Sequence, residues 1–290
     1  MKATTLNLRL LVAALLSTFN SCLPTALAQG SLTPPGAPAP TMKSLDQVEP
    51  RTPVDSIHTP GASLFMFYIN QPGSYYLTTN IVGLSGKDAI GISANNVTLD
   101  LNGFALIGAS GTEEGIHIYS TCTNVTVRNG NVSGWSDGLG RGIDCQANNA
   151  TLENLTVFAN GMGMQCLNSL VIRNCIISEN NTFGIELDAS GSLVIGNNLA
   201  GNNAANNPGE GAIYITGSNN RIENNHVTGS GLAGNGILIF NSSSITNNIV
   251  IKNSVEGGGA NNYSINTNYN DVGPIGSAST NTSPWGNISH

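Results

Sequence analysis

Apolar and polar residues alternate along the chain in short runs that recur at a fixed interval. The clearest copies open at Gly142, Gly163 and Gly184, so the period is 21 residues (163 − 142 = 184 − 163 = 21). Each copy continues as apolar–polar–apolar, passes a polar turn and resumes alternation up to an Asn. A period near twenty with strand alternation, rather than helical spacing, is typical of a β-solenoid, in which each repeat forms one rung of a stack.

Four-residue segments open the successive rungs. Their second and fourth residues are apolar in the first seven copies, so these side chains should point inward and the others outward. The pattern therefore predicts an all-β parallel β-helix of about seven or eight rungs over residues 61–270. The openings are 89–92, 115–118, 142–145, 163–166, 184–187, 212–215, 236–239 and a degenerate 262–265.

A column of asparagines ends the second strand of each rung. Asn tolerates left-handed backbone conformations, and stacked amides can hydrogen-bond to identical neighbours. The column predicts an internal Asn ladder at one turn, with a structural role rather than a binding role. Its members are Asn102, Asn129, Asn154, Asn174, Asn197, Asn224 and Asn247.

The two ends of the chain depart from the repeat. Residues 1–28 have basic Lys2 and Arg9, an apolar LLVAALL core and a small-x-small site, which predicts a Sec signal peptide. The protein is thus expected to be secreted, or at the cell surface or in the periplasm, with no transmembrane segment. Residues 29–60 predict a Pro-rich linker and N-terminal cap with a helical turn near 42–48, and residues 271–290 predict a C-terminal capping tail.

Four cysteines follow the predicted cleavage site: Cys122, Cys145, Cys166 and Cys175. Cys145 and Cys166 occupy the same inward position in successive repeats. Strands about 4.8 Å apart lie within disulfide reach, and two buried apolar thiols are the alternative. None of the four has zinc-ligand spacing.

The charge and the spacing of the glycines argue against nucleic-acid binding and against a nucleotide-binding site. Only 9% of the 290 residues are charged, the net charge is −7, and the ten Lys and Arg residues form no basic run, so no nucleic-acid partner is expected. The glycines recur at the rung period instead of forming a phosphate-cradling cluster, which argues against a nucleotide site.

The repeats GIxIxx and NVTLxN, with the lead-in PGSYYLTTNIVG, resemble right-handed parallel β-helix proteins of the exported pectate-lyase-like superfamily over roughly residues 61–270. The resemblance implies a right-handed coil. It also implies a range of activities, because the superfamily includes polysaccharide lyases, glycoside hydrolases, pectin methylesterases, phage tailspikes and members of no known activity. The NTD, GHG and RIK signatures of the polygalacturonases are absent, and RIE at 221–223 is only a near match. No family catalytic residue can therefore be assigned to a position in this chain.

Superfamily enzymes commonly place the substrate beside the first strand of each rung, so the outward positions there are the candidate site. Asp144, Glu186 and Asp188 are the candidate catalytic residues. The candidate substrate-binding residues are His117, Tyr119, Trp135, Arg141, Gln165 and Tyr214.

Two chemistries suit this set. Asp144 and Glu186 should lie two rungs apart, about 9.6 Å between backbones, and Glu186 and Asp188 about 6.7 Å apart along one strand face. Both separations approach the roughly 6.5–9.5 Å of an inverting glycosidase pair. A lyase would instead use Arg141 or His117 as the base, with the three carboxylates holding Ca²⁺. Otherwise no cofactor and no metal ligand is predicted.

Two functions remain open at this stage. The first is recognition of a polysaccharide or cell-surface glycan along the first-strand face, with or without cleavage. The second is a non-catalytic structural or surface solenoid, or a carbohydrate-binding module, in which the outward residues form a solvated face.

Overall fold

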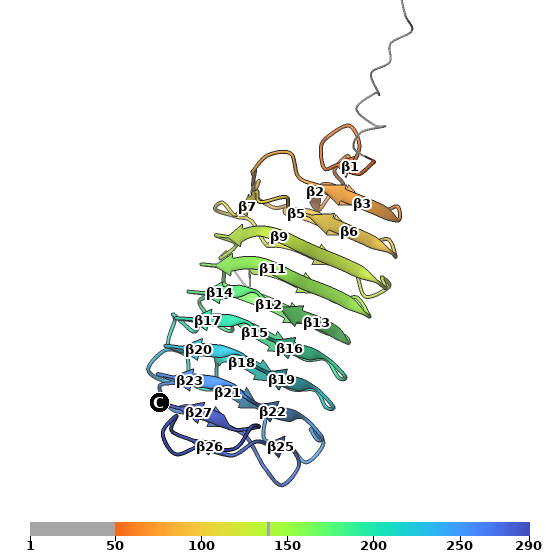
Figure 1. Cartoon of the computed structure of the whole chain (residues 1–290). Coiled ribbons are helices and arrows are strands. Elements are labelled where there is room, and N and C mark those ends of the chain that lie inside the picture. Colours follow the sequence, from red (N-terminus) through yellow and green to blue (C-terminus); the bar gives the residue numbers. More distant parts are fainter. Residues whose placement is uncertain (1–49, 138–139) are drawn as a thin grey trace, which may run out of the picture. The chain divides into compact units, whose positions relative to one another are not determined.

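The computed structural model describes residues 50–137 and 140–290, which coil into a parallel β-helix of nine turns (Figure 1). The predicted signal peptide and the linker up to residue 49, with its expected helical turn, lie outside the described residues. Within the described ranges the structure is all-β, and no helix is long and apolar enough to cross a membrane.

One side of the coil is a nine-stranded parallel sheet, here called the first-strand sheet. It contains one strand from each turn. In spatial order these are β2 (Phe65–Ile69), β5 (Asp88–Ile92), β8 (Glu114–Ile118), β10 (Arg141–Cys145), β12 (Met162–Cys166), β15 (Ile185–Leu187), β18 (Gly211–Ile215), β21 (Asn235–Ile239) and β24 (Asn261–Ser264).

The other sides belong to one 18-stranded sheet with two columns, which the long strands β9 (Val125–Ser133) and β11 (Ala150–Phe158) join. The first column also holds β1 (Thr52–Pro53), β3 (Gly73–Tyr76), β6 (Val97–Asp100), β13 (Leu170–Arg173), β16 (Leu193–Ile195), β19 (Arg221–Glu223), β22 (Ile249–Ile251) and β25 (Asp271–Val272). The second holds β4 (Ile81–Val82), β7 (Ala105–Ile107), β14 (Ile176–Ser178), β17 (Asn198–Ala200), β20 (His226–Thr228), β23 (Ser254–Glu256), β27 (Asn287–Ser289) and β26 (Ile275–Gly276).

The predicted inward positions form the core. From Ile90 and Ile92 to Ile237 and Ile239, the second and fourth residues of the first seven openings are at most 1% exposed. The predicted number of rungs is slightly too low. The additional rung begins at β2, whose aromatic FMFYI lacks the small opening residue of the repeat.

Buried asparagines do stack along the coil, but the predicted column needs correction. Six of its members, Asn102, Asn129, Asn154, Asn174, Asn224 and Asn247, take left-handed φ values of 53–60° at solvent-facing turns. Only Asn197 is buried, and it belongs to a ladder with Asn225, Asn253 and Asn287. The side-chain amides along that ladder are 3.0, 3.0 and 3.2 Å apart.

Two further buried stacks follow the same rule. Asn160, Asn180 and Asn202 form one, and Asn220, Asn248 and Asn270 form the other. In each stack an amide oxygen accepts the backbone N–H of the Asn in the preceding turn, and the amide nitrogen donates to a backbone carbonyl. The stacks thereby satisfy backbone groups where the coil bends, which is a structural role.

The four described cysteines are buried free thiols. Cys145 and Cys166 are direct register partners on β10 and β12. Burial raises the pKa of the Cys145 thiol to about 12, so it is inert as a nucleophile at neutral pH.

Short strands continue the large sheet at both ends of the described coil. At the start, β1 pairs with β3, and Val54 is buried against the core. At the end, β27 pairs with β23, and Asn287 closes the buried ladder over Asn253.

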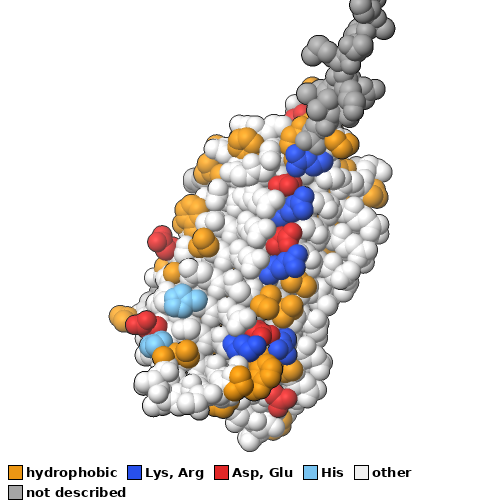
Figure 2. Space-filling view, in the orientation of Figure 1, with side chains coloured by type: hydrophobic (Ala, Val, Ile, Leu, Met, Phe, Trp, Pro, Cys, Tyr) orange, Lys and Arg blue, Asp and Glu red, His pale blue; other side chains and the backbone are white. Residues whose placement is uncertain are grey.

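A line of alternating charges crosses the first column of the large sheet (Figure 2). All but one of the ion pairs in this line join different turns of the coil, and the exception joins Arg221 and Glu223 within β19. They connect Arg51, Asp100 and Arg128, then Glu153 and Arg173, and finally Arg221, Glu223 and Lys252.

Candidate functional site

The outward column of the first-strand sheet has the register predicted from the repeat. Parallel pairing brings together successive third positions of the openings, so the candidate residues of this column do stack. In order they are Tyr68, Gly91, His117, Asp144, Gln165, Glu186, Tyr214, Leu238 and Ser264.

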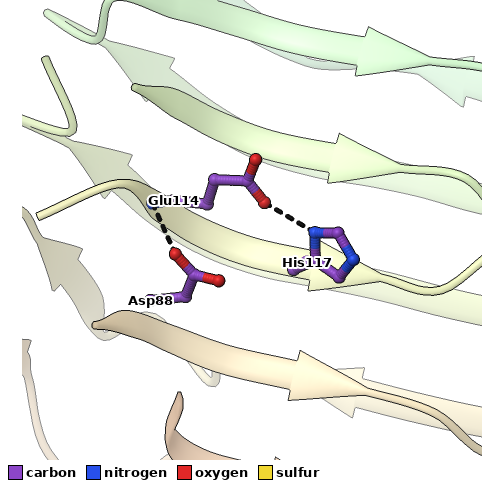
Figure 3. A group of neighbouring side chains, drawn as sticks. All are labelled: Asp88, Glu114 and His117. Atoms are coloured by element: carbon purple, nitrogen blue, oxygen red, sulfur yellow. Dashed lines mark hydrogen bonds and ion pairs between the residues drawn. The ribbon is translucent and has the colours of Figure 1, made fainter. Parts of the chain in front are cut away.

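Five charged residues on β5, β8 and β10 form what we call the His117 cluster: Asp88, Glu114, His117, Arg141 and Asp144. His117 Nδ1 lies 2.7 Å from Glu114 Oε2 and 3.2 Å from Asp144 Oδ2. Arg141 donates to the other Glu114 oxygen at 2.6 Å, and Asp88 accepts the backbone N–H of Glu114 at 2.9 Å. Figure 3 shows Asp88, Glu114 and His117 converging on the same side of the sheet.

This cluster is partly shielded from water, which strengthens the interactions between its charged groups. The side chains of Asp144, Glu114 and His117 are 2%, 12% and 18% exposed. Burial alone would lower the pKa of His117, but its hydrogen bonds to Asp144 and Glu114 outweigh burial and raise the pKa to about 10. Burial and the charge of Glu114 raise the pKa of Asp88 to about 6. His117 is therefore a protonated ion-pair partner at neutral pH.

Aromatic rings enclose one side of this histidine. The Tyr119 ring meets the imidazole edge-on with centroids 4.7 Å apart, and Phe65 lies 6.0 Å from both rings. Phe65 also stacks on Tyr68. A Cβ at Gly91 would come within 2.6 Å of the Phe65 ring, so a glycine is needed there for this packing.

Asp88 and Glu114 are site residues that the repeat pattern did not identify. They occupy the position immediately before the small residue of the opening, where Arg141 follows in the next rung. The sequence does contain a signal for them, because the residue before the opening is charged in three successive repeats: Asp88, Glu114 and Arg141.

A second group, here called the Glu186 cluster, lies further along the same column. It comprises Gln165, Phe183, Glu186, Asp188 and Tyr214. Gln165 donates to Glu186 at 2.9 Å, and Thr216 donates to Asp188. The Phe183 and Tyr214 rings stack with centroids 4.8 Å apart and an interplanar angle of 10°.

The two carboxylates of the Glu186 cluster lie in different environments. Glu186 is half-buried, and burial together with the charge of Asp188 raises its pKa. Asp188 is exposed. A shielded carboxyl with a raised pKa beside an exposed carboxyl group is an arrangement that can provide an acid and a base.

Two of the predicted site residues, Trp135 and Asp144, are buried rather than accessible to a ligand. Trp135 is 0% exposed and donates its ring N–H to the Leu106 carbonyl at 3.3 Å, so it is a core residue and cannot stack on a ligand. Asp144 is 1% exposed and is engaged by His117 and by Gln146 at 2.7 Å. Its geometry is that of a residue that positions His117, rather than one that meets a substrate.

A surface pocket of about 430 Å³ adjoins the His117 cluster. Glu114 and Arg141 form its wall on the sheet side, and the backbone N–H of Gly111 donates to Asp137 across it. The remaining lining residues are Thr112, Glu113 and Gly140.

The family model described as "Right handed beta helix region" matches residues 114–272, which is more than half of the chain. The chain belongs to the right-handed β-helix family. The match confirms the resemblance drawn from the repeats and the hand of the coil. No match was found among curated proteins.

Solved structures similar to this right-handed β-helix show the fold. The A-module of the Azotobacter vinelandii mannuronan C-5 epimerase AlgE6 superposes with a TM-score of 0.54 at 17% identity, over 76% of this chain and 62% of that one. The Dettilon tailspike protein gp208 superposes with a TM-score of 0.53 at 16% identity, over 67% and 42%. The β-helix thus spans less than two-thirds of either protein.

Proposed function

We propose that this β-helix binds a polysaccharide along its first-strand sheet and hydrolyses it at the Glu186 cluster. The observation that carries the proposal is the placement of Glu186, whose raised pKa suits a general acid, beside exposed Asp188 and the stacked Phe183–Tyr214 pair. An aromatic face beside paired carboxyl groups provides both a platform for a sugar ring and the groups that break a glycosidic bond.

The proposed reaction is inversion. Glu186 lies on β15 and Asp188 directly follows that strand, so their backbone positions are about 6.7 Å apart for an extended chain, and an inverting pair needs roughly 6.5–9.5 Å between its carboxyl groups to leave room for a water molecule. Glu186 would donate its proton to the leaving oxygen, and Asp188 would activate the water on the opposite side of the sugar. Tyr214 and Gln165 would orient the ring between them.

Elimination is the less favoured chemistry for this face. His117 holds a proton between two carboxylates, and Arg141 is paired with Glu114, so neither is a free base. Carboxylates also outnumber basic groups among the residues of the two clusters. The charge therefore favours a neutral glycan over a polyuronate, although one of the similar structures is an epimerase whose name specifies mannuronan.

The proposed setting is outside the cytoplasm. The support is the basic, apolar and small-residue pattern of residues 1–28 together with the glycan-directed face. Such a protein would meet its polysaccharide at a cell surface or in the surrounding medium.

Incubation of the purified protein with neutral, uronic and sulfated polysaccharides, with new reducing ends and unsaturated uronates followed separately, tests this proposal. Glu186→Gln and Asp188→Asn are the diagnostic variants, because each keeps its shape and loses a titratable group. His226→Gln, at an exposed position on β20, is the control. Hydrolysis is expected to fall at least a hundredfold in both diagnostic variants and to persist in the control.

Three other outcomes of this incubation would each favour a function other than hydrolysis. Unsaturated products would show a lyase and reject the hydrolytic pair. Binding without turnover would leave a carbohydrate-binding module. Absence of both on every polymer would favour the structural solenoid.

A further inference from the structure

Three side chains of types that commonly ligate metal ions lie close together in the His117 cluster, on the adjacent strands β5 and β8. One ligand atom each from Asp88, Glu114 and His117 lies within 4.8 Å of the others (Figure 3). The 2.7 Å between His117 Nδ1 and the Glu114 carboxylate is a hydrogen-bond distance, and these atoms would move apart to the roughly 3–3.5 Å that separates two ligands bound to one ion at about 2.0–2.2 Å. Only small side-chain movements would be needed to surround an ion.

The charges around this point do not balance without a cation. Asp88 is 8% exposed, and within the described ranges it has no ion pair of its own. A bound metal ion would displace the proton from His117, and with the imidazole then neutral the carboxylates of Asp88, Glu114 and Asp144 would be opposed by Arg141 alone. A divalent ion would supply the two positive charges that this set lacks.

A separate observation points to a missing partner at the same place. Asp144 Oδ1 is buried and has no hydrogen-bond partner in the described part of the chain, and neither has Arg141 Nε. The same Asp144 carboxylate lies 3.2 Å from His117 Nδ1. Unsatisfied buried polar atoms are rare in folded proteins, and a bound ion or water molecule commonly partners them.

We propose that Asp88, Glu114 and His117 form a binding site for a divalent transition-metal ion. Asp144 Oδ2 contacts the same Nδ1 atom of His117 as Glu114 does, so this buried carboxylate lies at the proposed site and adds to its negative charge. Glu114 and His117 remain partly exposed, so the ion can enter from solvent.

The chemical types of the three proposed ligands indicate which metal ions the site would prefer. One imidazole and two carboxylates suit Zn²⁺ or Mn²⁺, whereas Ca²⁺ prefers six to eight oxygen ligands. The site lies about three rungs from Glu186, roughly 14 Å at 4.8 Å per rung, so it is separate from the proposed hydrolytic pair. The inference does not depend on the proposed function.

Calorimetric titration of the chelator-treated full chain with ZnCl₂ tests the site without any glycan. One Zn²⁺ per chain is expected, together with a rise in melting temperature. Asp88→Asn, which keeps an acceptor for the Glu114 N–H, and His117→Gln should each weaken binding at least tenfold and abolish that rise. Asp271→Asn and His226→Gln, at exposed positions, are the matched controls and should bind like wild type.

Three results would overturn the proposal. Absence of Zn²⁺ uptake by the wild-type chain would mean that the cluster is an ion-pair network only. Uptake that survives both Asp88→Asn and His117→Gln would place the ion elsewhere. Equal affinity for Ca²⁺ and Zn²⁺, unaffected by His117→Gln, would remove the imidazole from the ligand set.

Discussion

At the scale of single residues, the environment of each carboxyl group decides its chemistry. Glu186 lies on β15 and Asp188 immediately follows that strand, but Glu186 is half-buried while Asp188 faces water. Asp144, on the same column, is buried and engaged by His117. The sequence could nominate all three carboxylates by position. Their different roles depend on burial and hydrogen bonding, which the repeat pattern does not contain.

The proton on Glu186 gives a prediction for stability. Because the pKa of Glu186 is raised in the folded chain above its ordinary value of 4.5, the folded state favours the protonated form. Its contribution to stability is therefore fully present below pH 4.5 and declines as pH rises through the folded pKa. Urea unfolding from pH 4 to pH 8 should show a smaller decline for Glu186→Gln than for wild type. Identical pH profiles would contradict the shifted pKa.

Trp135 gives a second prediction, which separates packing from ligand contact. Trp135→Phe should cost about 1–3 kcal/mol of unfolding free energy, because the buried Leu106 carbonyl loses its donor and ring volume is lost. Denaturant unfolding measures the cost. The affinity for any bound glycan should not change, and a large fall in affinity without a fall in stability would restore a stacking role.

At the scale of elements, the period of the repeat predicts most of what the structure contains. The first-strand register, the inward column and the small opening residues all follow from alternation and a fixed interval. The first rung was not counted because FMFYI in β2 lacks the small opening residue. Trp135 was misplaced because it lies in a return segment that does not repeat, so no column fixes its direction.

Neighbouring asparagines at one turn provide an element-scale test. Asn225 is 1% exposed, accepts from the Asn197 backbone and donates to the Val194 carbonyl, whereas Asn224 is exposed with φ 56°. Asn225→Ala should lower the unfolding free energy by about 2–4 kcal/mol, since it leaves buried groups unpaired. Asn224→Gly keeps the left-handed turn and should cost less than about 1 kcal/mol. Thermal or urea unfolding of the pair measures both, and equal costs would refute the assignment of the buried ladder.

At the scale of the whole molecule, stacking turns create two unlike surfaces. The first-strand sheet bears the His117 and Glu186 clusters, while the large sheet bears the line of alternating charges (Figure 2). Each turn contacts its neighbours, so we expect the stability of the coil to depend on how its two ends are closed.

Removal of residues 271–290 tests the role of the C-terminal end. The deletion takes away β25, β26 and β27, which leaves the edges of β22 and β23 unpaired and the Asn253 backbone N–H without its acceptor, the Asn287 side chain. A lower melting temperature and self-association are expected in sedimentation and thermal unfolding, because unpaired strand edges template association. Trp285→Ala, at a 53% exposed position, should behave like wild type. A deletion variant as stable and monodisperse as the full chain would show that this segment is not a cap.

The most direct test of the central claim is the affinity of a polysaccharide for two faces of the same coil. For a glycan that the wild-type chain binds, Tyr214→Ala removes an aromatic platform from the first-strand sheet, and Arg173→Ala removes an exposed side chain from the large sheet. The account predicts at least a tenfold loss of affinity for Tyr214→Ala and less than a twofold change for Arg173→Ala. The reverse pattern, or no effect of Tyr214→Ala, would contradict binding along the first-strand sheet.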